Sequence, residues 1–261
     1  AGRLVTTSLP NGIVTTNIYD EANRLTSITH KKGTTILESF TYVLDEVGNR
    51  LSMTDADGVT TYTYDALNRL TSVNYPSGIP LSVTYTYDAM GNRLTMTQDG
   101  VITTYLYNEA DQLITRVHDS QLTNYTWDNQ GNLLTKAGRT LTWNKAGKLA
   151  TWTSESTLTG YQYDGDGVRV SYTIDGIPTR YLQDSGSGMS VVLSETTGTA
   201  TTNYLYGADL IAQKSGDNRS YFLTDGLGST RLLANADGVI TTRYAYAVFG
   251  PIRSFIGTAE T

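Results

Sequence analysis

Hydrophobic and polar residues alternate along most of this chain, and tight-turn residues interrupt the alternation at regular intervals. In VTTYTYD, the residues Thr60, Tyr62 and Tyr64 fall on one face and the intervening Val and Thr residues fall on the other. Alternation of period two in β-branched and aromatic residues predicts a strand. The DALN that follows contains Asp and Asn, which bond nearby backbone groups and favour a tight turn. RLTSV then predicts the returning strand of a β-hairpin.

The same phrase recurs from one end of the chain to the other, for example as NIYDEANRLTSI, YTYDAMGNRLTM, YTWDNQGNLLTK and YQYDGDGVRVSY, mostly about twenty residues apart. This period suits two strands and two turns and is too short for the common helical repeats. Asp-Gly or Asn-Gly pairs, such as Asp57–Gly58 and Asp175–Gly176, predict turns at the opposite ends of the hairpins. The recurring positions are Tyr19, Asp20, Arg24, Tyr62, Tyr64, Asp65, Arg69, Tyr85, Tyr87, Asp88, Arg93, Tyr125, Trp127, Asp128, Tyr161, Tyr163 and Asp164.

The fold class predicted from this repeat is all-β. A lone hairpin cannot bury its apolar face, so tandem antiparallel hairpins are expected to join into one continuous sheet. A long sheet twists and must curl, spiral or close, as in a segment of a hollow β-shell or barrel. Its open edges invite other strands, so a homo-oligomer, tube or filament formed through those edges is one hypothesis.

The repeated Asp, Arg and Tyr residues are interpreted as structural. A catalytic group usually occurs once, whereas these recur in every unit and suit turn capping, pairing with a neighbouring hairpin and cross-strand packing. We therefore predict no catalytic residue and no enzyme. The alternative is an aromatic platform for glycans, which would use Trp127, Trp143 and Trp152 near the middle of the chain.

The phrase resembles the YD repeat of the Rhs/YD-repeat family, which includes bacterial Rhs proteins, toxin-complex C components, wall-associated proteins and the teneurin shell. YFLTDGLGSTRLLANADGVITTRYAYAVFGPI also resembles the start of the Rhs repeat-associated core. In many relatives the last phrase reads Tyr-Asp-Pro-Phe-Gly, whereas this chain has Ala247 and Val248 in place of Asp and Pro. The matching core positions are Asp225, Leu227, Gly228, Ser229, Arg231, Asp237, Gly238, Tyr244, Tyr246, Phe249 and Gly250.

This resemblance implies a spiralling shell, with a repeat array over residues 1–220 and a core-like segment over 221–261 that continues the sheet or plugs it. Bacterial relatives often enclose a C-terminal polypeptide, typically a toxin, and some release it by self-cleavage in a segment that would lie beyond Thr261. The implied partners are an in-cis C-terminal polypeptide or further segments of a longer shell. The implied location is secreted or at the bacterial cell surface.

Composition and charge exclude several other functions. The net charge is −6 and Lys and Arg form no cluster, so no nucleic-acid partner is expected. No run of 18 apolar residues predicts a membrane-spanning helix. The opening residues AGRLVTTSLPNG carry no leader pattern, so we expect any signal peptide to be absent or already removed.

Metal, cofactor and thiol chemistry are not expected either. The chain has no Cys, which removes disulfides, thiol nucleophiles and Cys-ligated metals. His30 and His118 lie far apart in the sequence with no ligand spacing around them, and we expect both at turns or on the surface. We predict a non-enzymatic shell or scaffold, with a glycan-binding adhesin and a self-assembling filament as alternatives.

Overall fold

The structure is a computed structural model that describes residues 2–78, 80–186 and 190–257. The described residues form 25 strands and no helix, which confirms the all-β prediction. Within them there is accordingly no helix long and apolar enough to cross a membrane. The first twelve strands are β1 (Thr6–Ser8), β2 (Ile13–Tyr19), β3 (Leu25–Lys32), β4 (Thr35–Leu44), β5 (Arg50–Asp55), β6 (Gly58–Tyr64), β7 (Leu70–Asn74), β8 (Ser82–Tyr87), β9 (Arg93–Gln98), β10 (Val101–Tyr107), β11 (Leu113–His118) and β12 (Gln121–Trp127). The others are β13 (Leu133–Lys136), β14 (Arg139–Trp143), β15 (Leu149–Thr153), β16 (Leu158–Tyr163), β17 (Arg169–Ile174), β18 (Ile177–Asp184), β19 (Val191–Thr197), β20 (Ala200–Tyr206), β21 (Leu210–Ser215), β22 (Asn218–Thr224), β23 (Thr230–Ala234), β24 (Ile240–Tyr246) and β25 (Ile252–Gly257).

The strands form the tandem hairpins that the repeat predicts. From β1 to β8, from β10 to β21 and from β22 to β25, each strand pairs antiparallel with the strand that follows it. In β6, Thr60 and Tyr62 are buried while Val59, Thr61 and Thr63 are exposed, as the alternation predicts. A register shift falls immediately before each of Tyr19, Tyr64, Tyr107, Trp127, Trp143 and Tyr163, the second aromatic of the phrase. The irregularity is therefore part of the repeating unit.

Most YD turns are closed by their own aspartate, and an asparagine takes its place at Asn108 and Asn144. The Asp65 N–H donates to the Arg69 carbonyl at 3.0 Å, and the Asn68 N–H returns to the Asp65 carbonyl at 3.0 Å. The Asp65 carboxylate accepts the Leu67 and Arg69 N–H groups at 2.9 and 3.0 Å. Hydrogen bonds from the Arg69 backbone N–H and guanidinium hold the pKa of Asp65 below its usual value, although burial opposes them. Asn68 has φ 59°, a left-handed conformation that Asn tolerates.

The repeated arginines take two different positions. Arg69 lies four residues after Asp65, and its Nε is 2.7 Å from the Asp65 carboxylate. In the turns after Asp45 and Asp88, which contain an added Gly, an asparagine takes the fourth position and the arginine moves to the fifth. Arg93 is such a residue, and its guanidinium lies 4.4 Å from the centre of the Tyr105 ring. Since successive strand residues point to opposite faces, one inserted residue changes an ion-paired arginine into one that stacks on the aromatic face.

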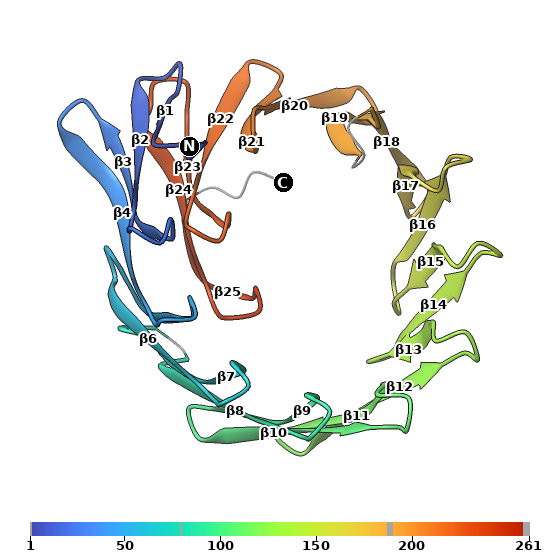
Figure 1. The fold of residues 1–261 in the computed structure, drawn as a ribbon. Helices are drawn as coiled ribbons and strands as arrows, with labels where there is room; N and C mark the ends of the chain where they lie inside the picture. The colour runs from blue at the N-terminus through green and yellow to red at the C-terminus, as the bar shows by residue number, and fades with distance from the viewer. Residues whose placement is uncertain (1, 79, 187–189, 258–261) are drawn as a thin grey trace. The chain divides into compact units, whose positions relative to one another are not determined.

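The described chain divides into two compact units. Unit 1 comprises Ala1–Thr86, Thr95–Ile102 and Asn218–Thr261, and unit 2 comprises Tyr87–Leu94 and Thr103–Asp217. In unit 1 the C-terminal strands β22 to β25 lie against the first repeats (Figure 1). Both sets of strands supply the core, with Phe40 and Val73 from the repeats and Leu223 and Leu232 from the C-terminal strands fully buried.

Unit 2 is built almost without a core. Of the hydrophobic side chains that are buried among the described residues, only Tyr105 and Ala212 belong to it. Its aromatic residues are mostly half-buried, as Trp127 and Tyr161 are. The predicted boundary between a repeat array (residues 1–220) and a core-like segment (residues 221–261) stays a prediction. Residues 258–261 of the core-like segment lie outside the described residues.

Candidate functional site

The contact between the C-terminal strands and the first repeats contains the most elaborate side-chain chemistry in unit 1. We call it the seam: the residues of β22 to β25 and their turns that touch β2 to β8. It joins positions far apart in the sequence, such as the Asn11 amide and the Asn235 carbonyl at 3.0 Å. On the same surface, the Arg243 guanidinium donates to the buried Glu38 carboxylate at 2.9 Å.

The first core motif, DGLGSTR, forms a turn of the same kind as the YD turns. The Asp225 carboxylate accepts the Leu227 and Ser229 N–H groups at 2.9 and 3.1 Å. The Gly226 N–H donates to the Tyr42 hydroxyl at 2.7 Å. Burial is the main cause that raises the pKa of Tyr42 to about 12, so this phenol stays protonated. The motif thus caps its own turn and also docks on β4.

Gly226 is required at this contact by the closeness of the Tyr42 ring. A Cβ added at Gly226 would stand 2.9 Å from three Tyr42 ring and hydroxyl atoms. We expect Gly226→Ala to lower the free energy of unfolding of unit 1 by about 1–3 kcal/mol, the usual cost of overpacking. Hydrogen-exchange mass spectrometry of peptides from β22 and β23 measures this loss. The control is Gly165→Ala, because nothing lies within 4 Å of an added Cβ there; equal loss in both variants would contradict the prediction.

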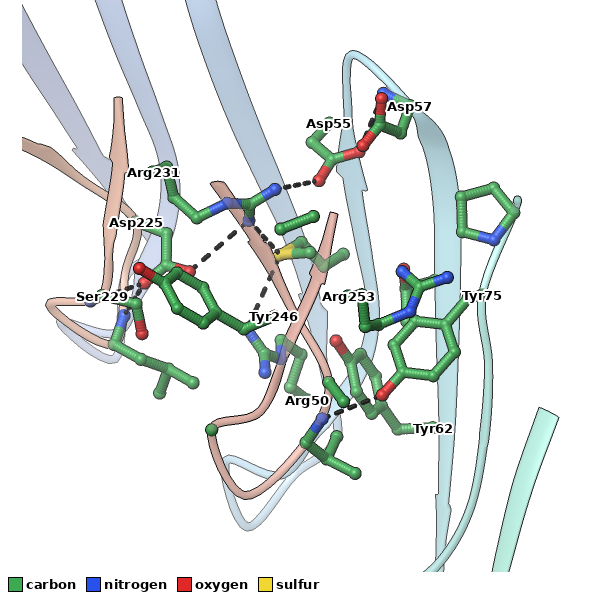
Figure 2. A pocket seen from close by; sticks show the side chains of 18 of the residues that line it. Arg50, Asp55, Asp57, Tyr62, Tyr75, Asp225, Ser229, Arg231, Tyr246 and Arg253 are labelled. Atoms are coloured by element: carbon green, nitrogen blue, oxygen red, sulfur yellow. Dashed lines mark hydrogen bonds and ion pairs between the residues drawn. The ribbon is translucent and has the colours of Figure 1, made fainter. Parts of the chain in front are cut away.

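Arg231, the last residue of that motif, is buried between two carboxylates. Its guanidinium lies 2.8 Å from Asp55 and 3.5 Å from Asp225, and all three side chains are less than 10% exposed (Figure 2). It also donates to the Tyr244 carbonyl at 2.9 Å and lies 4.8 Å from the centre of the Phe40 ring. Burial by itself lowers the pKa of Arg231, but the Asp55 hydrogen bond and the charges of Asp55 and Asp225 raise it overall. Arg231 therefore ties β23 to β5 as a permanent cation.

His30 was expected at a turn or on the surface, and this expectation is wrong. The side chain is 2% exposed in the seam, where its ring meets the Phe40 ring edge-on at 6.2 Å. Its Nε2 is 3.0 Å from the Thr224 carbonyl and its Nδ1 is 2.8 Å from the Thr15 hydroxyl. A carbonyl only accepts, so Nε2 carries the hydrogen, and a neutral ring accepts the hydroxyl at Nδ1. The C-terminal strands, which lie 194 residues away in the sequence, bury this histidine.

Burial of His30 predicts a pH dependence of stability. Desolvation lowers the pKa of His30 below its ordinary value of 6.5, and the hydrogen bond to Thr224 opposes this only in part. Because the folded-state pKa is depressed, the contribution of His30 is complete above about pH 6.5 and is lost as the pH falls toward the folded pKa, by up to ~1.4 kcal/mol per pH unit. Urea unfolding between pH 7.5 and 5 tests this. The slope over that range should be smaller in His30→Gln; an unchanged slope would contradict the assignment.

The departure from the core pattern at Ala247 and Val248 has a structural counterpart. The Val248 N–H donates to the Tyr75 hydroxyl at 2.8 Å. A proline at this position has no N–H and could not make the bond. The adjacent Phe249 ring meets Tyr85 edge-on at 5.5 Å. This turn thus anchors the end of β24 to β8 and to the loop before it, through the aromatic residues Tyr85 and Tyr75 of the repeats.

The three tryptophans lie in unit 2 and not in the seam. The indole N–H of Trp127 donates to the Leu113 carbonyl at 2.9 Å, and that of Trp143 donates to the Leu133 carbonyl at 2.8 Å. Tyr64, Tyr107 and Tyr163 make the same bond with their hydroxyls at the same repeat position. The Trp152 ring lies 4.9 Å from the Arg139 guanidinium carbon. Glycan binding at these residues stays a prediction, and two of the three indoles already bond within the sheet.

Comparison of the sequence with models of protein families supports the assignment of the YD repeat. The model of the teneurin YD-shell family matches residues 11–254, which is nearly the whole chain. The chain belongs to the teneurin YD-shell family. Among the curated proteins no relative matches this YD-shell chain.

The fold of this chain is also similar to parts of chains in solved toxin complexes. The YD-shell chain matches the Photorhabdus luminescens Tc holotoxin pore with 19% identity and a TM-score of 0.60. It matches the TcdB2–TccC3 complex with 19% identity and a TM-score of 0.62, and the same complex without its hypervariable C-terminal region with 18% identity and a TM-score of 0.61. Between 97% and 98% of this chain is covered, but only 15–16% of the solved chains. The likeness therefore establishes the fold, and this YD-shell chain spans about a sixth of their length.

Sequence reasoning picked out the core motif but not its partners in the YD shell. Asp55 and Glu38, which hold Arg231 and Arg243, were not selected beforehand. Asp55 ends the strand before the Asp57–Gly58 turn, and nothing local distinguishes it from other aspartates near turns. Among the described residues no group of three or more His, Asp or Glu side chains is placed to hold a metal ion.

Proposed function

We propose that this chain is a non-enzymatic wall segment of a longer YD-repeat shell, exported or at the cell surface, which encloses or presents a C-terminal polypeptide. Its tandem hairpins, matched by the YD-shell family over residues 11–254, carry the proposal. Further support comes from the fold likeness to chains about six times longer, one of which was also solved without a hypervariable C-terminal region. The repeated Asp and Arg residues serve their own turns and neighbouring hairpins, which suits a wall.

The test uses the protein purified from the cells that make it. Intact mass and sequencing of the C-terminal peptide establish whether the chain continues past Thr261. Limited proteolysis is then run before and after unfolding in urea. We expect a longer protein whose C-terminal polypeptide resists protease until the shell unfolds. A polypeptide that is cleaved equally in the folded state, or a chain that ends near Thr261, would overturn the enclosure proposal.

Two alternatives remain proposals of lower rank. Assembly through open sheet edges predicts a mass above that of the monomer at high concentration, measured by light scattering. Glycan binding predicts a loss of binding in Trp152→Ala, since the Trp152 indole N–H has no hydrogen-bond partner among the described residues. A glycan array without signal would remove that alternative.

A further inference from the structure

A cavity of about 470 Å³ opens in the seam beside the Arg231 ion pairs (Figure 2). Repeat residues of β5, β6 and the loop after β7 line one side, and the turns after β22 and β24 line the other. Leu227 and Phe249 stand at the cavity with 72% and 69% of their surface exposed. The cavity therefore combines a polar interior with two apolar side chains that face solvent.

Arg50 is one of two cations in this cavity that have no anionic partner among the described residues. Its guanidinium lies between two aromatic rings, 4.6 Å from the centre of Tyr62 and 5.7 Å from the centre of Tyr42. Its hydrogen-bond contact among the described residues is the Met53 sulfur at 3.8 Å, which is a weak acceptor. No described carboxylate lies within 4 Å of it, so most of its donors are unused.

Two tyrosine hydroxyls add further unused donors. Tyr62 is 6% exposed and lines the cavity, and its hydroxyl has no hydrogen-bond partner among the described residues. Burial is the main cause that raises the pKa of Tyr62 to about 12, so the hydroxyl keeps its hydrogen. The Tyr75 oxygen accepts the Val248 N–H, which leaves the Tyr75 hydroxyl hydrogen available to donate.

Arg253 of β25 completes the set of donors. Its guanidinium carbon lies 3.7 Å from the centre of the Tyr75 ring, and it donates to the Pro80 carbonyl at 3.1 Å and to the Ser77 carbonyl. Its Nε–H is buried without a partner in the described part of the chain. A buried hydrogen-bond donor without an acceptor lowers the stability of the fold, so a bound acceptor is expected at this position.

The acidic residues of the cavity do not fill this need. Asp55 and Asp225 are bound by Arg231, and Asp225 also accepts two N–H groups of its own turn. Asp57 also lines the cavity, but its side chain is exposed to solvent, where water screens its charge. The unused groups in the cavity are thus mainly donors, and Arg50 and Arg253 among them are permanently charged. An anion with two acceptor oxygens matches this arrangement.

We propose that the cavity binds a carboxylate, held by Arg50 with Tyr62 and Tyr75 as hydroxyl donors. The occupant that fits best is an Asp or Glu side chain of an extended polypeptide, because Leu227 and Phe249 would cover apolar residues beside it. A free small carboxylate carries the same chemistry. This inference goes beyond the shell proposal, since the site would exist in a wall that encloses nothing.

The probes are an acetylated and amidated peptide, Ala-Leu-Glu-Leu-Ala, its counterpart with Gln in place of Glu, and glutarate. Binding to the 261-residue chain is measured by NMR titration and calorimetry. We expect the Glu peptide to bind at least about tenfold more tightly than the Gln peptide, as the loss of a charge-assisted hydrogen bond predicts. Binding of glutarate without the Glu peptide would support the carboxylate site and assign it to small molecules.

Three variants locate the binding. Arg50→Gln should weaken binding of the Glu peptide about tenfold or more. Tyr62→Phe removes only a hydroxyl and keeps the ring, so it should weaken binding about threefold to tenfold without unfolding the chain. The matched control is Arg93→Gln, because Arg93 has the same repeat position and stacks on Tyr105 in unit 2; its affinity should stay unchanged. Equal binding of the two peptides, no binding of any probe, or unchanged binding in Arg50→Gln and Tyr62→Phe would overturn the proposal.

Discussion

Arg231→Gln is expected to lower the free energy of unfolding of unit 1 by about 3–5 kcal/mol. The substitution removes the cation and leaves Asp55 and Asp225 buried without their counter-charge, which is the costly way to break a buried ion pair. It also removes the contact with the Phe40 ring and the hydrogen bond to the Tyr244 carbonyl. Hydrogen-exchange mass spectrometry in urea measures the loss, followed in peptides from β5, β23 and β24.

The control for this variant is Arg24→Gln. Arg24 forms an ion pair at 2.7 Å with Asp20, but both side chains are about one quarter to one third exposed. Such pairs contribute less than about 1 kcal/mol because water screens them. Unit 2 offers an internal reference, since all three tryptophans lie there and their fluorescence follows unit 2. Equal losses in Arg231→Gln and Arg24→Gln would contradict the assignment of Arg231 as the central tie of the seam.

Phe40→Ala is expected to cost about 3–5 kcal/mol in unit 1, the usual range for truncating a fully buried phenylalanine. Phe40 is 0% exposed. Its ring lies beneath the Arg231 guanidinium and beside His30, so the cavity left behind would open next to charged and polar groups. Urea unfolding at pH 7.5, with hydrogen exchange in β4 and β22, gives the value.

Three further variants serve as controls for the Phe40→Ala measurement. Phe40→Leu keeps most of the volume and should cost less, which provides a folded variant if alanine is not tolerated. Leu67→Ala, at a turn position that is 68% exposed, should change stability by less than about 0.5 kcal/mol. Since Phe40 and Arg231 touch, their double variant should lose less than the sum of the single losses. Additive losses would show that the two side chains do not depend on each other.

The sequence predicted the repeating unit well because the interactions that make it are local. In the YD turns the aspartate, or the asparagine that replaces it at Asn108 and Asn144, bonds the backbone two and four residues ahead, as in Asp65 with Leu67 and Arg69. The alternation of buried and exposed residues in β6 follows directly from the pleat. The sequence alignment gave Arg69 and Arg93 the same position in the repeat, but their side chains have different contacts. The inserted Gly moves Arg93 onto the aromatic face, while Arg69 stays beside its aspartate.

The seam could not be predicted in the same way. Arg231 and Asp55 are 176 residues apart, and the Thr224 carbonyl that binds His30 is 194 residues away. The repeats resemble one another so closely that no local signal says which of them the C-terminal hairpins will contact. For this reason His30 was expected at a turn or on the surface, and Asp55 was not selected from the sequence.

By itself, then, the sequence determined the all-β class, the hairpin, the turn chemistry and the family resemblance, since each depends on residues within one unit. Only the tertiary structure decided which repeats receive the C-terminal strands, and with them the burial of His30, the pairing of Arg231 and the donor-lined cavity around Arg50. The physical reason is the range of the interactions. Backbone bonds within a turn are fixed by neighbours in the chain, whereas burial and ion pairing across the seam arise when two distant surfaces exclude water together.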